Sequence, residues 1–160
     1  MIRVGQGIDV HAFDESRPLV LGGVRIADQG GLAGHSDADV VLHALTDALL
    51  GAAGAGDIGE HFPSSDDRWR DAQSAHFVRE ALRIVADRDA VVVNADITII
   101  GERPRIAPHR ERIQNAVAEL LRVVPGQVNV KAKTTDHLGF LGRGEGLCAL
   151  AVVLIESQRA

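Results

Sequence analysis

The chain contains a single cysteine and no tyrosine, and aromatic residues make up only 3% of its 160 residues. One cysteine excludes an internal disulfide, which suits the reducing cytosol. Cys148 lies inside the apolar run 147–155, where it is expected to act as a small buried hydrophobe. So few aromatic side chains argue against a surface that stacks nucleic-acid bases.

Long apolar runs and an excess of positive charge are also lacking. No stretch approaches the ~18 apolar residues of a membrane-spanning helix, and no basic segment followed by an apolar one marks a signal peptide. The formal net charge of −5 disfavours nucleic acid as a partner, although a few local cations would suffice for an anionic small molecule. We therefore expect a cytoplasmic protein with neither a membrane nor a nucleic-acid partner.

What is present is the composition of an ordinary globular protein, with 46% hydrophobic and 24% charged residues. A chain of this length predicts one domain, over residues 1–160. Hydrophobic periodicity predicts strands at 2–10, 19–26, 91–100, 128–133 and 147–155, and helices at 36–53, 74–87 and from 108 to about 121. This order predicts an α/β (α+β) fold, a mixed sheet with helices packed on one face.

The N-terminal strand and the first helix carry a candidate metal site. Asp9 and His11 are two residues apart, so both side chains point to one face of a strand. With His43 on the helix they form a three-ligand set with an open fourth position, as in catalytic zinc sites. Asp47, one helical turn after His43, is a candidate acceptor for an imidazole N–H. The alternative is an Asp–His hydrogen bond at the strand end, with His43 in the core.

Other polar clusters admit two interpretations each. Ser36 predicts the N-cap of the first helix, with Asp39 three residues later; the first-turn N–H groups, beside His35, would then offer an anion site. The segment 57–60 is either a helix-ending turn or part of a site. The strand end 131–136 carries cations, hydroxyls and a carboxylate that can bind phosphate and Mg²⁺, or is merely solvated.

Six motifs occur in order along the chain, at residues 7–13, 21–26, 34–40, 42–51, 56–59 and 139–146. Together they resemble the 2-C-methyl-D-erythritol 2,4-cyclodiphosphate synthase family over nearly the whole chain. The resemblance implies a phosphorus–oxygen lyase of the non-mevalonate pathway of isoprenoid precursor synthesis. It would convert 4-diphosphocytidyl-2-C-methyl-D-erythritol 2-phosphate to the cyclic diphosphate and release CMP. The family fold, ferredoxin-like or chorismate-mutase-like, implies a homotrimer with active sites between subunits.

The resemblance also assigns roles to residues. Zn²⁺, or another divalent metal, would be held by Asp9, His11 and His43, and a second ion, Mg²⁺ or Mn²⁺, by Asp136. His35 and Thr134 match the positions that stabilise the transition state. The other implied substrate-binding positions are Ser36, Asp57, Gly59, Asp66, Gly101, Arg105, Ile106, Ala107, Lys133, Thr135, Phe140 and Arg143, in addition to Asp9, His11, His35, Thr134 and Asp136 themselves.

The chain departs from the family pattern at four of its positions. Lys133 stands where a threonine is frequent, and Asp136 where the longer glutamate is commoner. Ser64 replaces a frequent aspartate in the 57–71 loop, and Arg105 replaces a lysine. A guanidinium and an ammonium differ in geometry, so even this last exchange is not neutral.

Three alternatives stay open at this stage. A metal-dependent phosphatase could use the same metal ligands to activate water and would release inorganic phosphate. A non-enzymatic trimer could bind an isoprenoid diphosphate in an axial cavity. Near that axis, Arg143 and Glu145 would either contact such a ligand or form an inter-subunit ion pair, and we favour the ion pair.

Overall fold

The computed structural model describes residues 1–157 and is built on one five-stranded sheet, ordered β4-β1-β7-β5-β6. The strands are β1 (Ile2–Asp14), β4 (Gly31–Leu32), β5 (Ala90–Ile100), β6 (Val128–Lys133) and β7 (Gly146–Ser157). β5 and β6 run parallel, and the other neighbours are antiparallel. The predicted mixed sheet is thereby confirmed, and β6 has the predicted bounds.

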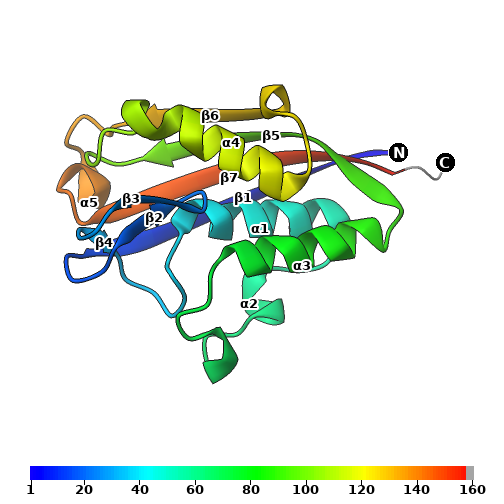
Figure 1. Ribbon diagram of the computed structural model, residues 1–160, viewed down its shortest axis with the longest axis horizontal. Helices are drawn as coiled ribbons and strands as arrows, with labels where there is room; N and C mark the ends of the chain where they lie inside the picture. Colours follow the sequence, from blue (N-terminus) through cyan, green and yellow to red (C-terminus); the bar gives the residue numbers. More distant parts are fainter. Residues whose placement is uncertain (158–160) are drawn as a thin grey trace.

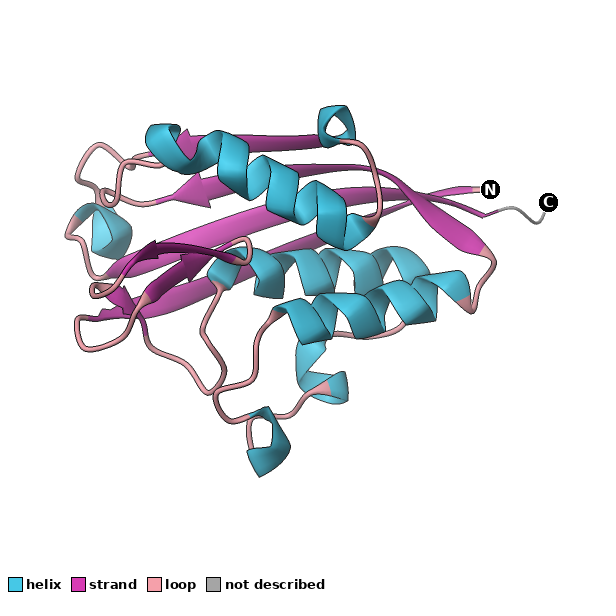
Figure 2. Ribbon diagram, viewed as in Figure 1, coloured by secondary structure: helices cyan, strands magenta, loops and turns pink. Residues whose placement is uncertain are grey.

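Three helices form a second layer over one face of the sheet (Figures 1 and 2). They are α1 (Val40–Ala53), α3 (Ala75–Ala86) and α4 (Arg110–Leu121). α1 packs against β1, β7 and α3, so it is enclosed on both sides and its apolar residues run around the helix. Leu42, Leu45 and Leu49 on it are fully buried.

Two glycines let α1 lie directly on β1. A Cβ on Gly5 would lie 1.9 Å from the Ala48 carbonyl oxygen, and one on Gly7 would lie 2.0 Å from the Ala44 carbonyl oxygen. Only residues without a side chain fit this interface. The close contact brings the start of α1 onto the part of β1 that carries Asp9 and His11.

Over residues 1–157, no helix covers the opposite face of the sheet, and this face carries an apolar strip. We call it the β1–β7 strip: it consists of Ile2, Val4, Ile8 and Val10 of β1 and Val152 of β7, which are 40 to 64% exposed. Soluble monomers rarely expose large contiguous apolar surface, so the strip is a candidate interaction surface.

Small elements complete the chain. The predicted strand 19–26 is a hairpin of β2 (Leu19–Leu21) and β3 (Val24–Ala27), and Gly22 and Gly23 make its turn with φ values of 62° and 78°. The expected loop 57–71 contains α2 (Ile58–His61) and a 3₁₀ turn (Asp67–Trp69). Two further 3₁₀ turns, Ala107–His109 and Pro125–Gln127, flank α4, and α5 (Gly139–Gly142) precedes β7. Within residues 1–157, no helix has the length and apolar character to cross a bilayer.

The predicted start of the first helix is wrong. The N-cap is Asp39 rather than Ser36: its carboxylate accepts the Val41 and Leu42 N–H groups, both at 3.1 Å. The same carboxylate accepts the N–H groups of Gly22 and Gly23. A carboxylate can accept all four bonds at once, which a serine hydroxyl cannot.

Candidate metal centre and substrate site

Asp9, His11 and His43 converge on one point. Asp9 Oδ2 lies 2.7 Å from His11 Nε2 and 3.0 Å from His43 Nδ1, and the two ring nitrogens are 3.1 Å apart. Asp9 and His11 face α1 because they are two residues apart on β1, and His43 meets them from the first turn of α1. Their three donor atoms lie within 4.8 Å of one another, so this predicted grouping is confirmed.

The orientation of the His11 ring suits a metal ligand. Its Nδ1 contacts the Ala33 carbonyl oxygen, which can only accept, so Nδ1 carries the proton. The Nε2 lone pair therefore points at Asp9 and His43. Two imidazole nitrogens and one carboxylate oxygen, all partly buried, form the donor set of a divalent transition metal such as Zn²⁺ with a free coordination position.

The electrostatics of the group fit a cation. Burial alone would raise the pKa of the Asp9 carboxyl, but the neighbouring imidazoles of His11 and His43 hold that pKa well below its usual range. Burial likewise lowers the pKa of His11, yet the hydrogen bond and charge of Asp9 outweigh it and the net pKa is raised. Asp9 is therefore ionised and supplies a negative charge where a cation would bind.

Asp47 is not the acceptor that the sequence predicted. Its carboxylate accepts the Ile58 N–H at 2.7 Å, and burial raises its pKa. The far nitrogen of His43, Nε2, instead faces the hydroxyls of Ser36 at 3.0 Å and Ser74 at 2.9 Å. Ser74 escaped sequence reasoning because its place at the start of α3 indicated only a helix cap.

The predicted anion site at the first helix is also wrong. Asp39 already satisfies the first-turn N–H groups and is fully buried, and burial raises its pKa to about 6. The Ser36 hydroxyl faces His43 rather than solvent. Near this point, His35 Nε2 is buried without a hydrogen-bond partner in the described part of the chain. Buried polar atoms are nearly always paired, so this unpaired nitrogen marks His35 as a candidate for a further contact.

The predicted site residues of the 57–71 segment have different partners in the structure. Asp57 caps α2 by accepting the Glu60 N–H at 2.9 Å, and the Asp47–Ile58 bond ties Asp57 and Gly59 to the helix that bears His43. Asp66 lies further along the segment, where its carboxylate pairs with Arg68, Nε to Oδ2 at 2.9 Å.

Six other predicted residues come together in one hollow of about 250 Å³ at the ends of β5 and β6. Because these strands are parallel, their carboxyl ends meet at one edge. Glu102 orders the rim by accepting the Thr135 N–H at 3.1 Å. The predicted residues that line the hollow are Gly101, Arg105, Ile106, Ala107, Lys133 and Thr134.

The remaining predicted residues lie on the turn after β6 and on α5. Asp136 is exposed and has a positive φ of 51°; the Thr134 hydroxyl lies 3.4 Å from its Oδ1. Phe140 is 46% exposed. Arg143 pairs with Glu145 of the same chain, Nε to Oε1 at 2.6 Å.

The metal group and the hollow do not meet within one chain. His11 pairs with Leu147 of β7, and β7 in turn pairs with β5, so β7 and β5 separate β1 from β6. At ~4.8 Å per strand spacing, β1 and β6 are about 14 Å apart. Within one chain the structure therefore presents two separate groups of predicted site residues.

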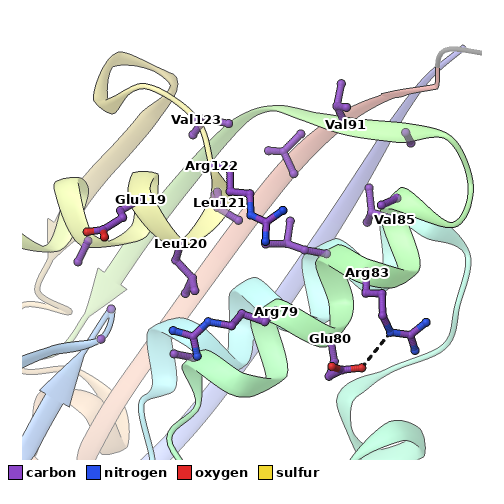
Figure 3. A pocket seen from close by; sticks show the side chains of 18 residues that line it. Arg79, Glu80, Arg83, Val85, Val91, Glu119, Leu120, Leu121, Arg122 and Val123 are labelled. Atoms are coloured by element: carbon purple, nitrogen blue, oxygen red, sulfur yellow. Dashed lines mark hydrogen bonds and ion pairs between the residues drawn. The ribbon is translucent and has the colours of Figure 1, made fainter.

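A larger hollow of about 850 Å³ lies elsewhere, between α3 and α4 (Figure 3). Arg79, Arg83 and Arg122 lie around it, with Arg83 paired to Glu80 at 3.1 Å. None of the predicted site residues lines it.

Known proteins match this chain over nearly its whole length, in sequence and in structure. A model described as the YgbB family matches residues 2–156. The 2-C-methyl-D-erythritol 2,4-cyclodiphosphate synthase of Geobacillus thermodenitrificans is 53% identical, covering 100% of both chains. A structure of 2C-methyl-D-erythritol-2,4-cyclodiphosphate synthase with CDP bound superposes with a TM-score of 0.88 at 40% identity, over 96% of this chain and 100% of the other. The bifunctional IspDF of Campylobacter jejuni matches with a TM-score of 0.95 at 41% identity, over 98% of this chain and 42% of that one.

Proposed function

Because the chain belongs to the YgbB family of 2-C-methyl-D-erythritol 2,4-cyclodiphosphate synthases, we propose that it carries out that cyclisation. The substrate is 4-diphosphocytidyl-2-C-methyl-D-erythritol 2-phosphate. An oxygen of the 2-phosphate forms a bond to the β-phosphorus, and the bond from that phosphorus to the bridging oxygen of CMP breaks. CMP leaves with the bridging oxygen, and no water is consumed.

The observation that carries the proposal is the convergence of Asp9, His11 and His43 in a chain with these relatives. A divalent metal bound there, which we propose is Zn²⁺, would supply Lewis-acid polarisation and orientation of a phosphate group. Two anionic phosphates must approach each other in this reaction, so charge neutralisation and positioning are the main requirements. The orphan nitrogen of His35 and the hydroxyl of Thr134 are our candidates for contacts to the transferring phosphoryl group.

The hollow at the ends of β5 and β6 is the proposed site of the cytidine diphosphate moiety, and the relative solved with CDP bound supports this class of ligand. Arg105 and Lys133 bring cations to the hollow. Asp136, exposed beside it, is the proposed protein ligand of a second ion, Mg²⁺ or Mn²⁺. Lys133, in place of the family's frequent threonine, would add a direct contact to phosphate.

A homotrimer would join the two groups of site residues. The exposed β1–β7 strip supports burial against another copy, and the separation of about 14 Å between β1 and β6 supports pairing the metal group of one subunit with the hollow of its neighbour. The number of subunits rests on the family resemblance. Ser36, Asp57, Gly59 and Asp66 would then border the methylerythritol phosphate, while Phe140 and Arg143 make further ligand contacts.

The test is to incubate the purified protein with the substrate, Zn²⁺ and Mg²⁺ and to follow the products by ³¹P NMR, with a chelator-treated sample as control. The proposal expects CMP and a cyclic diphosphate in equal amounts, both lost on chelation. Inorganic phosphate would instead identify a metal-dependent phosphatase. No turnover by metal-loaded protein would contradict the proposed enzyme.

A further inference from the structure

The side of the His43 ring that faces away from Asp9 and His11 is closed by a buried hydroxyl pair. Ser74 is fully buried and Ser36 is 4% exposed, and both hydroxyl oxygens lie within 3.0 Å of His43 Nε2. The two hydroxyls are 3.3 Å apart. Burying polar groups costs free energy unless they are paired, so this cluster needs a reason.

Ser74 stands at the N-cap position of α3 but does not cap that helix. Its backbone is αR, with φ −61° and ψ −20°, and its side chain makes no cap bond. The hydroxyl instead donates to Asp37 Oδ1, while Asp37 Oδ2 accepts the Ser74 N–H at 3.1 Å. A residue that gives up its usual local role is expected mainly at functional sites.

The hydrogen bonds fix the proton on the His43 ring. A carboxylate only accepts, so the Ser74 O–H must point to Asp37, and the Ser74 lone pairs are left facing Nε2. Nε2 must then carry the proton and donate it. The Nδ1 lone pair is thereby left for the side of the ring where Asp9 Oδ2 lies, 3.0 Å away.

The Ser36 hydroxyl also finds its hydrogen-bond partners when His43 Nε2 donates to Ser74. The Ser36 oxygen accepts the Ala38 N–H at 3.2 Å, and its O–H is free to donate to the Ser74 oxygen. Every polar hydrogen of the cluster then has an acceptor in the one tautomer that suits metal binding.

We infer that Asp37 and Ser74 are positioning residues that hold His43 in its metal-binding tautomer and orientation, as a carboxylate–hydroxyl–imidazole relay. This inference rests on the metal site of the proposed function. In metal sites generally, such outer partners of a ligating histidine affect affinity by about 10–100-fold. Here the relay spans three segments, since Asp37 precedes α1 and Ser74 begins α3.

Asp37→Asn and Ser74→Ala test the relay. The backbone N–H of Ser74 can only donate, so an asparagine at 37 is expected to keep its carbonyl oxygen there and to turn its NH₂ toward the Ser74 hydroxyl. The hydroxyl would then have to reverse and donate to Nε2, and the metal-binding tautomer would lose its support. Ser74→Ala removes the hydroxyl that accepts from His43 Nε2. It costs α3 no capping bond, because the Ser74 side chain does not cap that helix. Ser74→Thr keeps the hydroxyl and is the conservative rescue.

The matched control is Thr46→Val, which also removes a fully buried hydroxyl. The Thr46 hydroxyl donates only within α1, to the Leu42 carbonyl at 2.7 Å, so its loss probes stability without touching His43. Zn²⁺ affinity is measured on each metal-stripped full-length variant by competition with a chelating dye. The visible absorption spectrum of bound Co²⁺ reports the ligand geometry, and thermal unfolding is recorded in parallel.

The expected result is Zn²⁺ affinity about 10–100-fold weaker for Ser74→Ala and Asp37→Asn, with a changed Co²⁺ spectrum, recovery in Ser74→Thr and wild-type affinity in Thr46→Val. Wild-type affinity and spectrum in Ser74→Ala or in Asp37→Asn would overturn the inference, as would equal losses in Thr46→Val. Weaker binding by these variants in a protein that never forms the cyclic diphosphate would uphold the relay and reject the proposed reaction. A wild-type protein that binds neither ion overturns both.

Discussion

Replacing Gly7 by alanine should damage the metal group from a distance, through the packing of α1 on β1. The new Cβ would lie 2.0 Å from the Ala44 carbonyl oxygen, and real Cβ atoms come no nearer than about 3.0 Å to such an atom, so α1 must retreat by about 1 Å. Overpacking against backbone costs about 1–3 kcal/mol, sometimes more. Ala44 adjoins His43, so the retreat also separates His43 from Asp9.

Metal ligands tolerate displacements of only about 0.2 Å, so Zn²⁺ affinity should fall further than stability does. Urea unfolding of the metal-free protein gives the stability change, and chelator competition gives the affinity. Gly51→Ala on the same helix is the control: its Cβ would meet nothing closer than 3.8 Å, and alanine in a helix is favoured over glycine by about 1 kcal/mol. A Gly7→Ala protein with wild-type stability and affinity would refute the reasoning.

Four further predictions concern the metal group and the β1–β7 strip. His43→Ala should bind no Zn²⁺ and lose nearly all turnover while the oligomer stays intact, as judged by metal analysis and light scattering; a fully active variant would reject the zinc assignment. Zn²⁺ affinity measured against pH should drop by about tenfold per pH unit below the raised pKa of His11 and level off above it, because proton and metal compete for the same nitrogen. In the metal-free protein the raised His11 pKa adds stability that is fully present below pH 6.5, the ordinary value, and lost as the pH rises through the folded-state pKa; a urea midpoint that rises over this window would contradict the sign. Val4→Lys should dissociate the proposed trimer in sedimentation experiments, whereas Val124→Lys, at a residue 63% exposed outside the sheet, should leave it intact.

The sequence predicted best what depends on local periodicity. β6 alternates along its whole length and was placed at its observed bounds, and the i, i+2 rule placed Asp9 and His11 on one face. The predicted start of the first helix is too early, since Ser36 and Asp39 are both good cap residues and only the position of Gly22 and Gly23 makes the carboxylate the better acceptor. Local rules could not decide that competition.

The partners of His43 lay beyond sequence reasoning for another reason. Ser74 is 31 residues from His43, and nothing in its surroundings distinguishes it from an ordinary helix cap. Helical spacing from His43 points to Asp47, but the Asp47 carboxylate accepts the backbone N–H of Ile58 instead. The acceptor of the His43 imidazole is therefore determined by tertiary packing and not by spacing along the helix.

The pairing of β1 with β7 has a consequence for how the protein is made. β1 pairs with β7 along the run from Ile2 to Ala12, whereas β4 reaches only Phe13 and Asp14. The main partner of the first strand is therefore the last one described, and contacts so distant in sequence slow folding because a long loop must close. We expect β1 to remain without a long partner during most of synthesis on the ribosome. Asp9 and His11 would then reach their final geometry only when β7 pairs with β1, after the helix α1 that carries His43 has formed.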